Sequence, residues 1–156
     1  MNITLRKIKV IESMSEETTC YQAEICLDGK LVATAENRGT GGPDSYHFTV
    51  PDVRKQMEAY CATLPPLDMS EYKMDPLPMN LERYIGELLE KHQAAAHEKK
   101  VEAQKKRWCQ KKTVFRLKGD AVGAYRTINT PFDQKIKEHL VSKHGDKLEG
   151  ILNETV

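Results

Sequence analysis

The sequence lacks long apolar runs. No stretch approaches the roughly 18 consecutive apolar residues that a membrane-spanning helix needs. The N-terminal residues turn charged at Arg6 and Lys7, without the apolar stretch of a signal peptide. We therefore expect no membrane partner and a cytoplasmic location.

Closely spaced cysteine pairs are also missing. The four cysteines contain no C-x-x-C motif, and Cys20 and Cys26 are six residues apart. Within one strand that spacing corresponds to about 20 Å, far beyond the reach of a disulfide. We interpret the cysteines as free thiols in a reducing compartment. They are Cys20, Cys26, Cys61 and Cys109.

The motifs of common enzyme and metal sites do not occur. The five histidines form no H-E-x-x-H motif, no serine lies in a G-x-S-x-G sequence, and no Cys/His spacing fits zinc. Only His47, which follows a glycine-rich loop, is a candidate general base. The sequence therefore favours a protein without a cofactor or a metal, and a binding protein over an enzyme.

Charge is distributed unevenly along the 156 residues. The net charge is only +1. Residues 1–97 contain 10 Lys and Arg against 15 Asp and Glu, whereas residues 98–156 contain 14 against 8. The front of the chain is acidic and the back is basic, so a partner with surface charge is expected.

Alternating apolar residues and turn signals predict an antiparallel meander followed by a hairpin. The alternation slips near Lys7, which indicates a β-bulge, and Asp28-Gly29 is a strong hairpin turn. The predicted strands are residues 3–12, 18–27, 31–35, 46–50, 113–118 and 122–128.

Helical spacing of apolar residues predicts three helices, over residues 52–63, 80–96 and 131–143. Asn80 is the expected N-cap of the second helix, and Asn129-Thr130 before Pro131 form the expected cap of the third. After residue 96 the apolar stripe ends, although helix-forming residues continue to about residue 110. Leu148, Ile151 and Leu152 indicate one or two further helical turns.

Together these elements predict one α+β domain over residues 1–156. We expect a mostly antiparallel sheet of about six strands, with the three helices packed on it and residues 97–112 extending as a basic helical arm. The domain would comprise a meander with one helix, a connector, the long helix with its basic end, and a final hairpin with C-terminal helices. These parts are residues 1–63, 64–79, 80–112 and 113–156.

The basic segment is the strongest anomaly in the chain. Residues 99–118 hold nine Lys and Arg against the single acid Glu102. Such a surface suits an acidic protein or, with its aromatic residue, a nucleic acid, and it also fits a solvated helix face. The long helix, whose apolar stripe ends at residue 96, could also pair with a second copy of the chain. The predicted partner-binding residues are Lys99, Lys100, Lys105, Lys106, Arg107, Trp108, Lys111 and Lys112.

A glycine-rich loop precedes the fourth predicted strand. Its backbone N–H groups could form an anion or nucleotide site, but the loop lacks the G-K-[ST] ending of a phosphate-binding loop. A loop that makes structural contacts is the alternative. The candidate residues are Arg38, Gly39, Gly41, Gly42 and His47.

The connector over residues 64–79 combines four prolines with three methionines. Methionine adapts to irregular surfaces, including binding surfaces. The two interpretations are a strap that packs over the protein's own core and a contact surface for a partner.

Residues 27–42, followed by Tyr46-His47-Phe48, resemble small uncharacterised proteins of bacteriophages and prophages. In those proteins a hairpin of the type x-G-K-x-V-x-x-A-x-N leads into a glycine-rich loop. The resemblance covers about twenty residues and carries no catalytic residues. It implies a small protein that binds a bacterial host protein or a protein–nucleic-acid complex, such as an inhibitor of host defence; anti-CRISPR proteins are of this kind.

Overall fold

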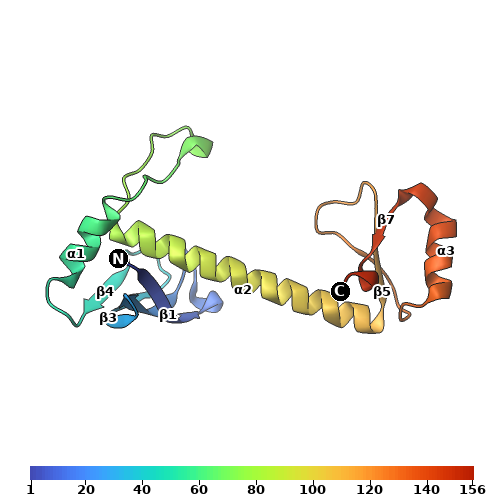
Figure 1. The fold of residues 1–156 in the computed structure, drawn as a ribbon, viewed down its shortest axis with the longest axis horizontal. Coiled ribbons are helices and arrows are strands. Elements are labelled where there is room, and N and C mark those ends of the chain that lie inside the picture. The colour runs from blue at the N-terminus through green and yellow to red at the C-terminus, as the bar shows by residue number, and fades with distance from the viewer. The chain divides into compact units, whose positions relative to one another are not determined.

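The computed structural model describes residues 1–156, which form two compact units, Met1–Gln93 and Ala94–Val156. Each unit has its own sheet and its own hydrophobic cluster. The long helix α2 (Leu81–Lys111) begins in the first unit and ends in the second. We call these parts unit 1 and unit 2 and describe each by itself (Figure 1).

Unit 1 contains a four-stranded antiparallel meander in the order β1-β2-β3-β4. The tight turn between the second and third strands is the predicted Asp28-Gly29 turn. Both residues have positive φ, 48° and 84°, as a two-residue hairpin requires. The strands are β1 (Ile3–Val10), β2 (Tyr21–Leu27), β3 (Lys30–Asn37) and β4 (Ser45–Phe48).

The predicted bulge in the first strand is confirmed. The pairing of β1 with β2 shifts register between Arg6 and Lys9, and Lys7 between them has φ 48°. The bulge explains why the apolar alternation of this strand changes phase at Lys7.

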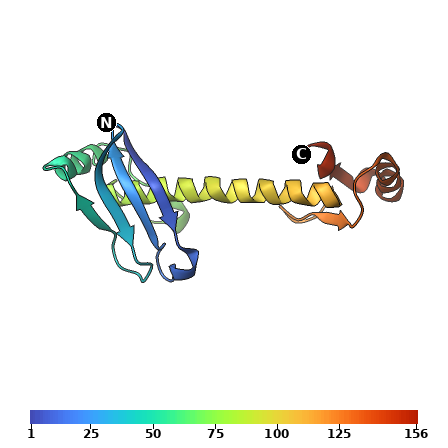
Figure 2. The same cartoon turned by 90° about the horizontal axis from the view of Figure 1, so that it is seen from below.

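Two helices cover one face of this sheet, which the views in Figures 1 and 2 both show. They are α1 (Val53–Cys61) and the first turns of α2. The core between the layers includes Ile25, Met57 and Ile85, all fully buried. Asn80 caps α2 as predicted, because its Oδ1 accepts a hydrogen bond from Arg83 N at 2.9 Å.

Unit 2 holds a separate three-stranded antiparallel sheet in the order β6-β5-β7. Its strands are β5 (Thr113–Leu117), β6 (Arg126–Ile128) and β7 (Leu148–Ile151), and helix α3 (Gln134–His144) follows β6. The prediction of the α+β class is confirmed, whereas the single six-stranded sheet is wrong. The hairpin of residues 113–128 does not extend the meander; β5 pairs with β6 and β7 instead.

Strand β7 replaces the helical turns that we predicted at the C-terminus. The inward residues Leu148 and Ile151 are three apart, a spacing that also fits a helix, and the four-residue strand is too short to reveal its alternation. Short 3₁₀ segments follow or precede several elements: Glu12–Met14, Ser70–Tyr72, Gly145–Lys147 and Leu152–Glu154.

Helix α3 begins three residues later than the sequence predicted. Asp133, not a residue before Pro131, is the N-cap, and its Oδ1 accepts from Ile136 N at 2.8 Å. Leu140 of α3 packs against Phe115 and Ile151 of the sheet of unit 2. The helix therefore belongs to this second core, and not to the meander as we predicted.

Candidate partner-binding surface

The C-terminal end of α2 is fixed by a residue far along the chain. Asn153 Nδ2 donates to the carbonyl oxygens of Cys109 and Lys112 at 2.9 and 2.8 Å, and its Oδ1 accepts from Val114 N at 2.7 Å. The last carbonyls of a helix have no partner within the helix, so this amide satisfies two of them. Asn153 thereby holds the basic end of the helix on unit 2.

The basic end of α2 has an inner and an outer face. Val101, Lys105, Cys109 and Lys112 are half-buried and recur every three or four residues, so they face the rest of unit 2. By the 3.6-residue period, the opposite side of the helix carries cations, and its two other residues are Gln110 and Ala103. We call its cations the basic face: Lys99, Lys100, Lys106, Arg107 and Lys111.

Two of the predicted partner-binding lysines lie on the inner side. Lys105 Nζ lies 3.3 Å from Glu102 Oε1 and 5.5 Å from the centre of the Tyr125 ring. Its hydrogen bond to Glu102 raises the pKa of Lys105. Lys112 is half-buried next to the capped helix end. Both therefore contribute less to an outward surface than the sequence suggested.

The basic face concentrates charge of one sign. It extends from Lys99 to Lys111, 13 residues of helix, which at the helical rise corresponds to about 18 Å. Arg107 and Lys111 stand four residues apart, and like charges at that spacing destabilise a helix by a few tenths of a kcal/mol. Trp108, at the edge of this face, remains 36% exposed.

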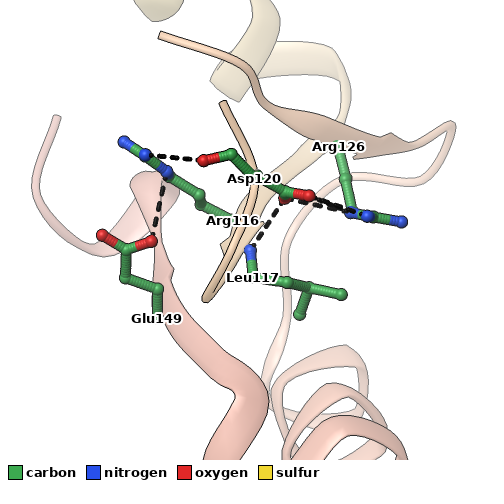
Figure 3. A network of polar contacts seen from close by, with 5 residues as sticks. All are labelled: Arg116, Leu117, Asp120, Arg126 and Glu149. Carbon is green, nitrogen blue, oxygen red and sulfur yellow. Dashed lines mark hydrogen bonds and ion pairs between the residues drawn. The ribbon is translucent and has the colours of Figure 1, made fainter. Parts of the chain in front are cut away.

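Two arginines of unit 2, Arg116 in β5 and Arg126 in β6, are paired with carboxylates of the same unit (Figure 3). Arg116 Nε lies 3.1 Å from Glu149 Oε2, as an ion pair without the angle of a hydrogen bond. Arg126 donates to both carboxylate oxygens of Asp120, at 2.7 and 3.0 Å. These hydrogen bonds, with one from Leu117 N, lower the pKa of Asp120 to about 2.

In the glycine-rich loop, internal hydrogen bonds occupy two of the N–H groups that we considered for an anion, those of Gly39 and Gly41. Asn37, only 8% exposed, accepts from Gly39 N at 2.8 Å through Oδ1 and donates through Nδ2 to Gly42 O and Asp44 Oδ1. Gly41 N donates to Thr18 Oγ1 at 3.3 Å. The structure thus gives the loop contacts with its own unit, which supports the alternative of a structural loop.

Gly39 is the residue of this loop whose backbone lies closest to the segment of residues 14–18. Its carbonyl oxygen accepts from the N–H groups of Glu16, Glu17 and Thr18 at 3.0 to 3.3 Å. Its φ is +85°, and a Cβ at this position would lie 2.1 Å from Met14 O. Glycine is therefore needed here for packing as well as for backbone conformation.

The two other candidate residues near this loop, Arg38 and His47, form no catalytic arrangement. Arg38 is exposed, and His47 is exposed on β4, where it pairs with Thr34 and makes no hydrogen bond with a carboxylate. No group of three or more His, Cys, Asp or Glu side chains has a geometry that could hold a metal ion.

Sequence reasoning missed a polar cavity of about 540 Å³ in unit 1. Next to it, the hydroxyls of Tyr21 and Tyr46 donate to Asp44 Oδ2 at 2.6 and 3.0 Å. Burial, together with Asp44, raises the pKa of both tyrosines, so they stay neutral donors. The residues lining the cavity come from three separate segments, and no local pattern reveals it. They are Pro43, Asp44, Tyr46, Arg54, Glu58, Asn80, Leu81 and Glu82.

Comparison with family models, curated proteins and solved structures yields no match for this chain. None of its helices combines the length and the apolarity that crossing a bilayer would require.

Proposed function

We propose that this chain is a non-enzymatic binding protein whose basic face contacts an acidic surface of a partner protein. One observation carries the proposal: Lys99, Lys106, Arg107 and Lys111 are exposed, and none of them forms an ion pair within the chain. Exposed charge of one sign steers an oppositely charged partner and selects it over others.

The fixed end of α2 supports the same proposal. Because Asn153 bonds the last carbonyls of the helix, the basic face is presented by a rigid element rather than by a frayed end. A preformed surface loses less conformational entropy on binding.

The biological setting that we propose follows from the resemblance to bacteriophage proteins. In that setting the chain would block a bacterial host or defence factor by occupying its surface, as anti-CRISPR proteins do. Such a mode of action needs no catalytic residues.

Nucleic acid is the second candidate partner, and Trp108 is the observation that favours it. The indole is 36% exposed, and Lys111 neighbours it three residues later on the helix, so a base stacked on it would lie beside a phosphate-neutralising group. Stacking on an aromatic side chain contributes about 1–3 kcal/mol per base.

The test reverses charge on the basic face. The variant Lys99→Glu/Lys106→Glu/Arg107→Glu should lose capture of a partner from bacterial lysate. A matched control, Lys118→Glu/Lys135→Glu/Lys143→Glu, makes the same change of net charge at exposed lysines elsewhere in unit 2 and should retain the partner. Equal capture by both variants would refute the proposal.

Nuclease treatment and salt separate the two kinds of partner. Capture of a protein should survive nuclease treatment of the lysate. A nucleic-acid partner should be lost with nuclease, and its affinity should fall steeply between about 50 mM and about 200 mM salt.

A further inference from the structure

Leu64 and Met79, at the two ends of the connector between α1 and α2, pack in the core of unit 1, as the strap interpretation expects. The residues between them form a closed loop instead. Leu67 N donates to Leu77 O at 2.8 Å, and Leu77 N donates back to Leu67 O at 3.1 Å. Figure 1 shows this loop rising from the ends of the two helices, clear of the four-stranded sheet of unit 1.

Hydrogen bonds inside the loop fix its tip. Met69 O accepts from Tyr72 N at 3.0 Å and from Met74 N at 3.3 Å. Asp68 Oδ1 accepts from Ser70 N at 2.9 Å, and the hydrogen bonds from Ser70 lower the pKa of Asp68. The tip is therefore preorganised, which reduces the entropy lost when it binds a partner.

The tip exposes two large side chains of the kind that dominate protein interfaces. Tyr72 is 70% exposed and Met74 is 55% exposed. Tyrosine is enriched among interface hot spots, and methionine adapts its shape to a partner. The tip also carries three acids against one base. We call it the acidic knob: Asp68, Met69, Ser70, Glu71, Tyr72, Lys73, Met74 and Asp75.

The chain itself contains a surface of matching chemistry. Trp108 lies at the edge of the basic face and is 36% exposed; Lys111, three residues later, is its neighbour on the helix surface, and Arg107 lies further round the same face. A surface with an exposed ring and cations complements a knob with exposed apolar side chains and carboxylates. Methionine–aromatic and cation–aromatic contacts would each add to this pairing.

We propose that the acidic knob of one molecule docks on Trp108 and the adjoining cations of a second copy of the chain. The inference deepens the proposed function because it uses the edge of the same basic face, so that self-association and the outside partner compete. A knob of this size buries a small area, so we expect a weak complex with a dissociation constant on the order of 10–100 μM.

Sedimentation velocity of the full chain over a concentration series tests the proposal. We expect a monomer–dimer equilibrium that weakens from about 50 mM to about 200 mM salt. The variant Tyr72→Ala/Met74→Ala should raise the dissociation constant about tenfold or more. The control Val122→Ala removes apolar surface from a residue that is 97% exposed in unit 2 and should leave it unchanged.

Two charge-reversal variants give a sharper test. Glu71→Lys/Asp75→Lys makes the knob basic, and Arg107→Glu/Lys111→Glu makes the edge of the basic face acidic. Each variant alone should stay monomeric. An equimolar mixture should associate, because each knob then meets a surface of opposite charge. A wild-type chain that stays monomeric into the millimolar range, or a mixture that does not associate, overturns the inference.

The same variants distinguish failure of this inference from failure of the proposed function. Tyr72→Ala/Met74→Ala should still capture an outside partner, and should do so more effectively because competition is removed. If the wild type is monomeric but Lys99→Glu/Lys106→Glu/Arg107→Glu loses the partner, only the self-association is wrong.

Discussion

The two units of this chain are stabilised in different ways. Unit 1 buries a cluster of fourteen hydrophobic residues between its sheet and its helices, whereas the cluster of unit 2 has three buried members. In unit 2, side-chain hydrogen bonds add to the stability that this small apolar core provides. The main ones are those of Asn153 at the end of α2 and those that join Asp120 to Arg116 and Arg126. A small apolar core makes such a unit more dependent on each hydrogen bond.

The units also differ in charge. The change from an acidic to a basic balance lies between residues 97 and 98, and the boundary between the units lies between Gln93 and Ala94. The two positions are equivalent in charge, because residues 94–97 contain no Asp, Glu, Lys or Arg. Unit 2 therefore combines the smaller core with the excess of positive charge. Charges of one sign repel within a compact unit, so a partner that neutralises them would also stabilise unit 2.

The largest expected effect concerns unit 1. Gly39→Ala places a Cβ within 2.1 Å of Met14 O at a positive φ, and we expect it to lower the free energy of unfolding by about 3 kcal/mol or more. Chemical denaturation followed by circular dichroism would measure the change. Gly42→Ala is the control in the same loop, since its Cβ would meet nothing within 4 Å, and it should have little effect.

Hydrogen exchange should show where that destabilisation acts. Amides of the meander should lose protection in Gly39→Ala, while those of unit 2 should keep it if the units are energetically independent. Equal loss of protection in both units would mean that the two units unfold as one cooperative structure.

A somewhat smaller effect is expected in unit 2. Asn153→Ala leaves the carbonyls of Cys109 and Lys112 and the N–H of Val114 without their partner. The free energy of unfolding should therefore fall by about 2–3 kcal/mol. Trp108 is the only tryptophan of the chain, and its fluorescence reports unit 2 alone.

The variant Asn153→Asp separates the two roles of this amide. It keeps an acceptor for Val114 N but cannot donate to the helix carbonyls, and it adds negative charge at a helix C-terminus, which is unfavourable. It should therefore destabilise unit 2 as well. An Asp variant as stable as the wild type would show that the cap contributes nothing.

Acid should weaken unit 2 through Asp120. Its pKa is about 2 in the folded chain, below the ordinary 3.8, so its ion pairs stabilise fully above about pH 4. That contribution is lost as the pH falls toward 2. Asp120→Asn should be less stable than the wild type at pH 7, and the difference should shrink near pH 3 when both are unfolded with urea. A difference that does not depend on pH would contradict this assignment.

The smallest expected effect is on the basic face itself. Arg107→Glu removes a like-charge pair with Lys111 and should change the free energy of unfolding by about 0.5 kcal/mol at most. Its thermal midpoint should stay close to that of the wild type. A large loss of stability would mean that Arg107 serves the fold, which would remove the main support for the proposed surface.

Features encoded by neighbouring residues could be predicted well. The Asp28-Gly29 turn, the bulge at Lys7 and the cap at Asn80 each depend on a few adjacent residues, and all three are confirmed. The exposure of the basic face also follows from local spacing, because the side of the helix that carries these cations holds no large apolar residue. By contrast, no local pattern in the connector over residues 64–79 indicated that Leu67 and Leu77 pair and close it into a loop.

The sequence by itself determined the α+β class, most elements of unit 1 and the division of charge, because periods of two and 3.6 residues and runs of like charge are local properties. Only the tertiary structure decided which strands share a sheet. It also decided that β7 is a strand, that Asn153 caps a helix 41 residues away, and that Asn37 ties the glycine loop to Asp44. These contacts join groups from separate segments, and their partners are set by packing in three dimensions rather than by any local pattern.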